Sequence, residues 1–363
     1  MSRCKLEEFI SYEQPAKYIV DSDQYDDSYE TPVLTAGKSF ILGYTDEKNN
    51  IFDNLPVIIF DDFTTSVQFV DFPFKVKSSA MKLLKNTEQA DIKYCYYLLK
   101  FLQHTPENHK RQWLSATSQK TVDLPTIEEQ KNIVKKLDKI LEVIDNQNKQ
   151  LELLDEAIKA RFVEMFGDPV HSEKYGTRKL SSCVAEKSDM VDGPFGSQVN
   201  TKVDYIENGE IPVIRTVNVK MMSFSPTDLK YMTREKYETV IRSQVLPGDV
   251  ILTKVGTIGN VCIFPNAFDE AVLSTTGSCR IRVDNSVVNT QFFAYNLMYL
   301  KGKLLEIASA GVQPFLNMNH VKNIDILDVS LEKQKEFADF VKEIDKSRLL
   351  SNHSLSLIKS IIF

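Results

Sequence analysis

Two polar loops in the second half of the chain combine the residue types that contact nucleic acids. Arg215-Thr-Val-Asn218 follows the predicted strand 211–214, and Lys254-Val-Gly-Thr-Ile-Gly-Asn260 follows the predicted strand 249–253. Arginine can fork onto a guanine edge, lysine and hydroxyl groups suit phosphates or bases, and glycine lets the backbone approach closely. If this half of the chain reads nucleic acid, the candidates for contact are Arg215, Thr216, Asn218, Lys254 and Thr257, with a solvated loop charge as the ordinary alternative for each single residue.

The first half of the chain carries loops of the same kind. Thr35-Ala-Gly-Lys-Ser39 and Asp61-Asp-Phe-Thr-Thr65 follow short apolar strands, and Ser115-Ala-Thr-Ser-Gln119 is similar to Ser309-Ala-Gly-Val-Gln313. Ala36-Gly-Lys-Ser39 lacks the leading glycine of a phosphate-binding P-loop, because residue 32 is proline, so nucleotide binding is not predicted. On the same condition, the further candidates for contact with nucleic acid are Lys38, Ser39, Thr64, Thr65, Gln119, Lys120 and Gln313, the last as a reader of adenine.

The spacing of the candidate ligands argues against metal or nucleophilic chemistry. His104 and His109 flank a turn that contains proline instead of sharing a helix face, and the other three histidines are isolated. Asp61 and Asp62 suit a turn better than a metal site. The five cysteines are widely spaced and form no Cys-x-x-Cys pair, which predicts reduced thiols. We therefore expect no catalytic residue and no metal on this chain.

Length and composition bound the class of protein. The chain has 363 residues, 42% of them hydrophobic, which is enough for two cores of ordinary size. Its formal net charge of −6 argues against a protein that coats nucleic acid without regard to sequence, but not against local cations that contact phosphates. The sequence shows no signal peptide and no apolar stretch of membrane-spanning length, which predicts a cytoplasmic protein outside the membrane.

The two halves of the chain repeat the same order of segments. A repeat of this length indicates the architecture before any single motif does, and it predicts two copies of one α+β domain in a pseudo-twofold arrangement. The matching segments, first copy then second, are 31–34 and 211–214, 57–60 and 250–253, the aromatic helices 93–102 and 291–300, and 128–131 and 332–335.

Each half ends in a heptad pattern that is typical of helices packed along their length. Adding 204 to the residue numbers of the first pattern gives those of the second. The polar residues Gln147 and Ser351 interrupt the two patterns at equivalent positions. Equal registers favour two antiparallel helices that pair with each other over two helices that each lie on their own domain. The predicted helix-pairing residues are Ile133, Leu137, Ile140, Ile144, Leu151, Leu154 and Ile158, and Phe337, Val341, Ile344, Leu355, Ile358 and Ile362.

Local signals bound these helices. Thr126 and Glu129 form a capping-box pattern, and Gly167-Asp-Pro169 ends the first helix. The second helix ends opposite Lys159 on the 204 offset and is expected to be the shorter. The predicted order is a β-rich domain over 1–125, a helical spacer over 126–168, a β-rich domain over 169–329 and a second helical spacer over 330–363.

This arrangement resembles the specificity subunits of type I restriction-modification systems over nearly the whole chain. The resemblance implies two target-recognition domains, each reading one half of a split sequence in double-stranded DNA, set apart by the two helices. The segments whose sequence resembles that of the family are Leu124-Pro-Thr-Ile-Glu-Glu-Gln130, Arg161-Phe-Val-Glu-Met-Phe-Gly-Asp168, Gly193-Pro-Phe-Gly-Ser197 and Leu246-Pro-Gly-Asp-Val-Ile-Leu-Thr-Lys-Val-Gly-Thr-Ile-Gly-Asn260.

The resemblance also implies partners. Two methyltransferase (M) subunits would dock on the helices, and restriction (R) subunits would complete the complex. S-adenosylmethionine would bind the methyltransferase, so no cofactor and no enzymatic activity are expected of this chain. Two alternatives stay open: the equivalent subunit of another methylating restriction system of the type IIB or IIG kind and, more distantly, a self-contained nuclease whose helices form a dimer.

Overall fold

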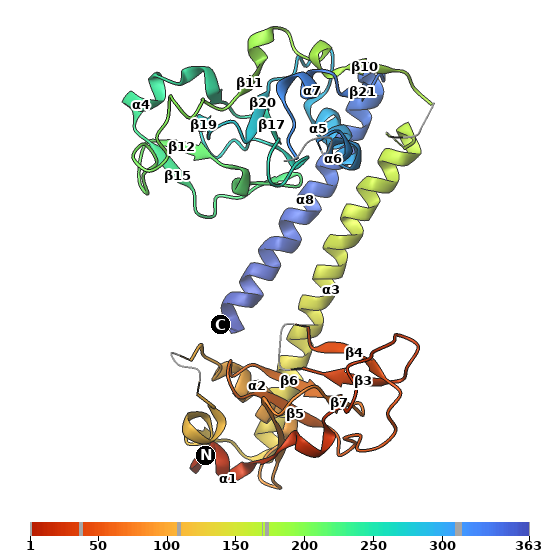
Figure 1. The fold of residues 1–363 in the computed structure, drawn as a ribbon, viewed down its shortest axis with the longest axis vertical. Coiled ribbons are helices and arrows are strands. Elements are labelled where there is room, and N and C mark those ends of the chain that lie inside the picture. The colour runs from red at the N-terminus through yellow and green to blue at the C-terminus, as the bar shows by residue number, and fades with distance from the viewer. Residues whose placement is uncertain are drawn as a thin grey trace. The chain divides into compact units, whose positions relative to one another are not determined.

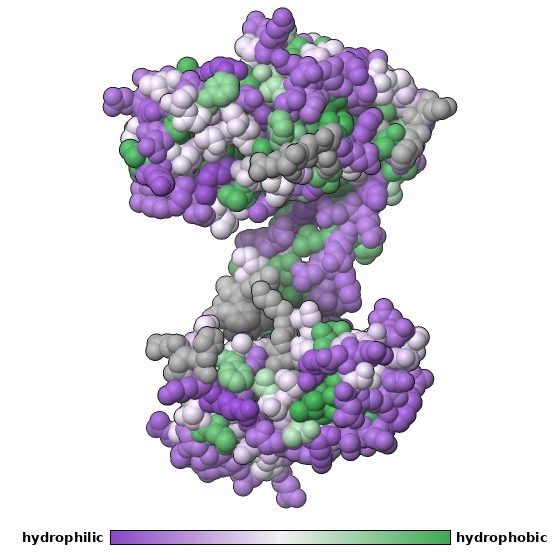
Figure 2. Space-filling view, in the orientation of Figure 1, coloured by the Kyte–Doolittle hydropathy of each residue, from purple (hydrophilic) through white to green (hydrophobic). Residues whose placement is uncertain are grey.

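The chain divides into two compact units, and the boundary between them falls within one long helix. The computed structural model describes residues 2–35, 39–106, 110–168, 170, 174–308 and 314–362. Unit 1 comprises residues 1–146 and unit 2 residues 147–363; each has a sheet-rich body and part of helix α3 (Ile127–Phe166) (Figure 1). Polar side chains cover most of the visible face of each unit (Figure 2). Within these described ranges, no helix is long and apolar enough to cross a membrane.

Unit 1 is built on two sheets and a strand pair. The main sheet has the order β2-β8-β5-β6, the second has the order β4-β3-β7, and β1 pairs with β9. Its elements are β1 (Ser2–Lys5), α1 (Leu6–Phe9), β2 (Ile10–Glu13), β3 (Thr31–Leu34), β4 (Ile41–Thr45), β5 (Val57–Asp61), β6 (Val67–Val70), β7 (Lys75–Val76), β8 (Met81–Asn86), α2 (Ile92–Phe101), β9 (Thr121–Leu124) and the first part of α3.

Two apolar clusters pack on the central strand β5 of unit 1. Ile58 and Phe60 belong to the cluster that includes α2 and Trp113. Val57 and Ile59 belong to the other cluster. Alternate residues of a strand point to opposite faces of the sheet, so both faces of β5 are covered. A strand covered on both faces reads as a continuous apolar run, which is what the sequence has here.

Unit 2 repeats this plan with more and shorter strands. Its sheets have the orders β11-β20-β17-β18 and β15-β12-β19-β16, with the pairs β10-β21 and β13-β14 beside them. Its elements are β10 (Thr177–Lys179), β11 (Met190–Asp192), β12 (Ile211–Ile214), β13 (Val219–Lys220), β14 (Ser223–Phe224), β15 (Lys230–Met232), α4 (Arg234–Glu238), β16 (Gln244–Val245), β17 (Val250–Thr253), β18 (Val261–Ile263), β19 (Ala271–Leu273), β20 (Ser278–Ile281), α5 (Thr290–Tyr299), α6 (Lys301–Ala308), α7 (Met318–Lys322), β21 (Asp325–Leu327) and α8 (Leu331–Ile362).

The strand orders confirm the internal repeat. The central strands β5 and β17 each lie between a following hairpin partner and a later strand of the main sheet. β3 pairs in parallel with β7, and β12 pairs in parallel with β19. The helices α2 and α5 follow the last strand of the main sheet in both units. The α+β class and the two repeated domains are therefore as predicted.

One backbone hydrogen bond shows which loops of the two units correspond. Gln112 N donates to Asp62 O (2.8 Å) just after β5, and Leu316 N donates to Lys254 O (2.9 Å) just after β17. Gln112 and Leu316 are thus equivalent. The loop Ser115–Gln119 follows its anchor in the chain, whereas residues 309–313 precede theirs. The two loops therefore lie on opposite sides of these anchors in the chain, and residues 309–313 themselves lie outside the described residues.

In unit 2 the end of α3 packs against the start of α8 in the antiparallel direction. Arg161 Nη2 pairs with Glu336 Oε1 at 2.6 Å, and Arg348 pairs with Asp155. Residue numbers increase along α3 in the direction in which they decrease along α8. This confirms the predicted antiparallel pairing for the part of α3 that belongs to unit 2.

The predicted seam residues of unit 2 lie on the covered faces of these helices. In unit 1 Leu137, Ile140 and Ile144 are half-buried, but Ile133 is 36% exposed, and its neighbour Val134 packs on the core of unit 1 instead. The side chain of Ile362 lies outside the described residues. The buried or half-buried seam residues of unit 2 are Leu151, Leu154, Ile158, Phe337, Val341, Ile344, Leu355 and Ile358.

An aromatic cluster anchors the helix pair in the core of unit 2. Phe162 is fully buried, and its ring centroid lies 5.3 Å from that of Phe337 and 6.0 Å from that of Phe292. Phe166 is also fully buried and lies 5.0 Å from Phe292 and 5.6 Å from Phe337. Buried aromatic rings in such arrangements dominate the energetics of a core. The segment Arg161–Phe166 therefore joins α3, α5 and α8 into one packed body.

A buried glutamine ties the start of each long helix to its domain. Gln130 Oε1 accepts from Asp91 N, and Gln334 Oε1 accepts from Asn289 N, each at 2.8 Å. Asp91 and Asn289 are the N-cap residues of α2 and α5. Each glutamine also donates from Nε2 to a backbone carbonyl just before its helix. A buried amide satisfied at both ends fixes the geometry of the groups it joins.

Candidate nucleic-acid interface

Three loops of unit 2 line one open cleft. They follow β12, follow β17 and join β19 to β20, so they come from both sheets of the unit. The structure thus brings together the two loops chosen from the sequence and adds a third. The lining residues are Arg215, Thr216, Val217, Val255, Gly256, Ser274, Thr275, Gly277 and Ser278.

Arg215 brings a cationic fork to this cleft. Its Nη2 donates to Asp228 Oδ2 at 2.7 Å and also to the carbonyl oxygen of Asp228. Its side chain is 26% exposed. Its Nε is buried and has no hydrogen-bond partner among the described residues. A guanidinium has five donors in a fixed plane, so Arg215 keeps donors that can meet acceptors on another molecule.

The other predicted residues of the same loop have different surroundings. Thr216 is half-buried and lines the cleft. Asn218 is fully buried, and its Oδ1 accepts from Arg215 N at 3.0 Å. Its Nδ2 donates to the carbonyl oxygens of Ser225 (3.0 Å) and Thr227 (3.1 Å). All of these hydrogen bonds of the Asn218 side chain are to the backbone of unit 2, so Asn218 shapes the loop that carries Arg215.

Lys254 lies beneath the cleft loops. It is 4% exposed and forms an ion pair with Asp192 at the end of β11. Its backbone N donates to Gly277 O at 2.8 Å, which joins the second loop to the third. A direct contact between Lys254 and DNA would require this buried pair to open. Thr257, at the exposed tip of the same loop, is directly accessible.

The third loop, Ser274-Thr-Thr-Gly-Ser278, is not among the residues predicted from the sequence. Ser278 is 2% exposed, and its Oγ has no hydrogen-bond partner within the described part of the chain. The hydroxyls of Ser274 and Tyr205 lie 2.9 Å apart. A run of small hydroxyl residues directly after the strand β19 is the sequence signal that marks this loop, as a polar run after a strand marks the other two.

Gly193 allows a fourth segment to close on the third loop. A Cβ at this position would lie 1.7 Å from Ser274 O, and Gly193 N donates to Ser278 O at 3.4 Å. Only glycine permits so close an approach of two backbones. The segment Gly193–Ser197, whose sequence resembles that of the family, therefore supports the wall of the cleft.

The predicted residues after β5 in unit 1 form a tight turn. Thr65 has a φ of +58° and is 2% exposed, and its Oγ1 donates to His104 O at 2.6 Å. Thr64 is exposed, and its Oγ1 donates to Asp61 Oδ2 at 2.6 Å. Asp61 Oδ1 also accepts from a backbone N two residues on, so Asp61 is the turn residue that its position predicts. A contact with DNA by the Thr65 side chain would require this turn to open.

The remaining predicted residues of unit 1 come from two other loops. Ser39 is exposed in the turn between β3 and β4. Gln119 is exposed, and its Oε1 accepts from Lys5 Nζ at 2.9 Å. Lys120 is half-buried, and its Nζ donates to a backbone carbonyl at the end of α2 at 3.2 Å. Two further predicted residues, Lys38 and Gln313, lie outside the described residues.

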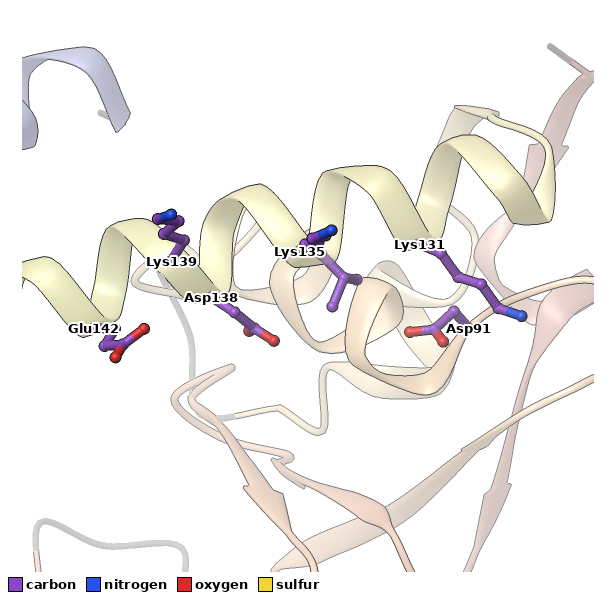
Figure 3. Close-up of a pocket in the computed structure, with 7 residues that line it drawn as sticks. Asp91, Lys131, Lys135, Asp138, Lys139 and Glu142 are labelled. Carbon is purple, nitrogen blue, oxygen red and sulfur yellow. The ribbon is translucent and has the colours of Figure 1, made fainter.

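A shallow groove in unit 1 runs along α3 beside the start of α2. Lys131, Lys135 and Lys139 project from successive turns of α3 (Figure 3). Asp138 lies on the same stretch and pairs with Lys93 of α2 at 2.7 Å. The three α3 lysines are exposed, and the acidic side chains of Asp91, Asp138 and Glu142 line the same groove, so its charges are mixed.

Within the described part of the chain, the thiols and the potential metal ligands form no second site. All five cysteines are unpaired. Burial raises the pKa of the Cys95 and Cys262 thiols to about 12, so both are protonated at neutral pH. Over the residues that the structure describes, no group of three or more His, Cys, Asp or Glu side chains is arranged to hold a metal ion.

Comparison with known protein families identifies the chain. The model of the family described as "Type I restriction modification DNA specificity domain" matches residues 3–156 and 191–360. The chain belongs to this family. The two matches each cover one copy of the internal repeat, and the specificity subunits of the family are non-catalytic.

Individual relatives agree with this family. The chain is 38% identical over 222 residues to the EcoR124I/EcoR124II specificity subunit of Escherichia coli, a match that covers 58% of this chain and 53% of that protein. The matched stretch thus spans about half the length of that relative. The chain is also 24% identical to the MjaVIII specificity subunit of Methanocaldococcus jannaschii, over 94% of this chain and 85% of that protein.

A solved structure shows the same fold. The S subunit of a type I restriction-modification system from M. genitalium superimposes with a TM-score of 0.61 and 14% sequence identity. The superposition covers 99% of this chain and 93% of the other. At this identity the likeness describes the fold alone.

Proposed function

We propose that this chain is a DNA-specificity subunit that binds a split double-stranded target and directs methyltransferase (M) and restriction (R) subunits to it. The observation that carries the proposal is the cleft of unit 2, where three loops present Arg215 together with small hydroxyl residues. Membership of the specificity family supports it. The chain itself makes and breaks no covalent bond; S-adenosylmethionine binds the M subunit.

Each repeated domain reads one half-site. Residues 1–125 and 169–329 are the two target-recognition domains, and residues 126–168 and 330–363 are the helical spacers. The loops of the two domains carry different side chains on a common scaffold, so the half-sites differ in sequence. Phosphate contacts hold the domain on the duplex, and contacts to base edges select the sequence.

The long helices carry the partner subunits. Two M subunits dock on the charged faces of the helices, and R subunits complete the assembly. Lys131, Lys135 and Lys139 alternate with Asp138 and Glu142 on the first helix, a face of mixed charge that suits a partner surface of complementary charges. The five unpaired thiols suit an assembly that works in the reducing cytoplasm.

Methylation mapping tests this function directly. We expect one split sequence to be methylated in a host that expresses this chain together with its methyltransferase. Arg215→Ala should alter only the half of that sequence assigned to residues 169–329. Methylation of the same sites without this chain, or of an unsplit site, would contradict the proposal.

The activity of the purified chain separates the alternatives. Incubated alone with DNA and either S-adenosylmethionine or a divalent metal ion, the chain should neither methylate nor cleave. Cleavage by the chain alone would support a self-contained nuclease. A specificity subunit of another methylating system is distinguished by the subunit with which this chain co-purifies.

The spacer role is tested by lengthening both helices. One heptad inserted after Gln147 and another after Ser351 keeps each seam in register and adds about 10.5 Å. At ~3.4 Å per base pair, the spacing between half-sites should grow by up to about three base pairs. The half-site sequences should not change. An active complex with an unaltered spacing would reject the spacer role.

A further inference from the structure

We propose that Asp228 is a specificity-determining residue: it holds Arg215 in the cleft and releases it only to the acceptor-rich edge of a guanine in the half-site. The inference rests on the proposed function and deepens it, because it names a base and the residue that enforces its selection. Asp228 lies between β14 and β15, outside the three loops that line the cleft.

The contacts between the two side chains form a closed latch. Arg215 Nη2 is bound by both the carboxylate and the carbonyl oxygen of Asp228, whereas its buried Nε has no partner among the residues described. Asp228 is 60% exposed, so solvent screens the pair and little free energy is needed to open it. Arg215 is therefore held in a defined place without being locked there.

Asp228 is itself fixed and ionised. Its φ of +53° lies in the left-handed region, which Asp and Asn adopt more readily than other side chains. Lys230 Nζ lies 3.2 Å from Asp228 Oδ1 and 2.5 Å from Glu207 Oε1. Hydrogen bonds from Arg215 and Lys230 hold the pKa of the Asp228 carboxyl below its usual value. The Asp228 carboxylate is thus ionised at neutral pH.

The cleft around Arg215 suits a base edge that accepts hydrogen bonds. Ser278 contributes a buried hydroxyl that has no partner in the described chain, and Val217 and Val255 contribute exposed apolar side chains. Guanine presents O6 and N7 together in the major groove, and a bidentate arginine is the commonest specific contact to that pair. Adenine places a donor beside N7, which would face the donors of Arg215.

The negative charge of Asp228 disfavours a phosphate in the place of the guanine. A phosphate that approaches Arg215 must come close to the Asp228 carboxylate, and like charges repel. A guanine edge is neutral and takes two hydrogen bonds in one plane, so it can replace Asp228 without that penalty. Asp228 therefore removes an unspecific phosphate contact and leaves a specific one.

The first test measures binding to a duplex of mixed sequence by the full chain assembled with its methyltransferase. Asp228→Asn keeps the size and backbone tolerance of the side chain and removes its charge. Arg215 should then gain a phosphate contact, which steepens the slope of log affinity against log salt by about 0.9. Between about 50 and 200 mM salt, affinity should fall about three- to fourfold more than for wild type. An unchanged slope would overturn the proposal.

A matched variant controls for net charge. Asp328 is 45% exposed and pairs with Arg178 beside β21, so Asp328→Asn also removes one exposed, paired carboxylate from unit 2. Its salt slope should stay at the wild-type value. An equal change in both variants would show a general effect of charge and would overturn the role of Asp228.

The second test reads the preferred base from duplexes enriched out of a random library. Wild type should enrich a guanine in the half-site of residues 169–329, Arg215→Gln should lose that preference, and Asp228→Asn should weaken it. In the Arg215→Gln background, Asp228→Asn should have no further effect on that position. Retention of the full guanine preference by Asp228→Asn would overturn the inference, whereas a wild-type complex that enriches no sequence would overturn the proposed function itself.

Discussion

Beneath the loops of both domains lies a buried ion pair, and its charges are reversed between the two. In unit 1 the residue after β5 is Asp62, whose carboxylate lies 3.1 Å from Lys82 Nζ of β8. In unit 2 the residue after β17 is Lys254, which pairs with Asp192 of β11. The strand orders around the two pairs are the same, but the partners come from different strands, because β8, which carries Lys82, corresponds to β20, whereas β11, which carries Asp192, corresponds to β2.

The reversal shows what the scaffold requires. Burial of a single charge costs several kcal/mol, so the fold needs a partner for it but sets no preference for which strand provides the acid. In unit 1 Asp62 also accepts from Trp113 N at 2.8 Å, which closes the next segment over the pair. In unit 2 the loop after Lys254 lines an open cleft instead. A common core thus supports loops of different chemistry.

Breaking the pair in unit 1 should have the largest effect. Lys82→Met leaves the fully buried Asp62 carboxylate without a cation, which should destabilise unit 1 by about 3–5 kcal/mol. Lys254→Met should cost unit 2 only about 1–3 kcal/mol, because Asp192 is 20% exposed and can be hydrated. Hydrogen exchange of β5 and β17 measures the two losses separately. Equal losses would contradict the difference in burial.

Replacing the buried glutamines should affect both units alike. Gln130→Ala and Gln334→Ala each leave a half-buried N-cap amide without its acceptor, so each should cost about 1–3 kcal/mol. Urea denaturation and exchange of the amides of Asp91 and Asn289 measure this. Glu128→Ala, on the exposed side of the same helix turn, should change stability by less than about 0.5 kcal/mol. A large effect in one unit only would show that the two anchors are not equivalent.

Removing the guanidinium of Arg215 should affect recognition of only one of the two half-sites. Arg215→Ala should weaken discrimination at one base of the half-site read by residues 169–329 by about 1–3 kcal/mol. Competition binding with duplexes that differ at single positions measures it. Lys254→Ala should act mainly on the stability of unit 2, because its ammonium is buried. A change in the half-site of residues 1–125 caused by Arg215→Ala would reject independent reading by the two domains.

The ion pairs on the helix surface should matter least. Arg348 pairs with Asp155 and with Asp345, and Asp155 is 73% exposed. Solvent screening limits such pairs, so Arg348→Ala should cost about 0.2–1 kcal/mol in urea denaturation of the full chain. A larger loss would mean that Arg348 fixes the register between α3 and α8.

The sequence by itself determined the repeat, the α+β class and the two long helices. These features depend on local chemistry: apolar residues every second position or in heptads, and turn residues between them. Ile58 and Phe60 alternate with Val57 and Ile59 whichever segments cover them. The positions of two cleft loops followed in the same way, because each is a polar run directly after a strand.

Only the tertiary structure decided which loop residues are accessible. Lys254 and Arg215 both stand after a strand in polar loops, yet the first is buried against Asp192 and the second lines the cleft. Asp192 is remote in sequence, so no local pattern could reveal that pair. No local pattern could reveal the cleft position of the loop 274–278 or the contact between Arg215 and Asp228 either. Nor could it reveal the backbone hydrogen bonds of Gln112 and Leu316, which show that 115–119 and 309–313 lie on opposite sides of equivalent residues. The free energy of a polar side chain depends on partners that only the folded chain brings within reach, and periodicity carries no information about them.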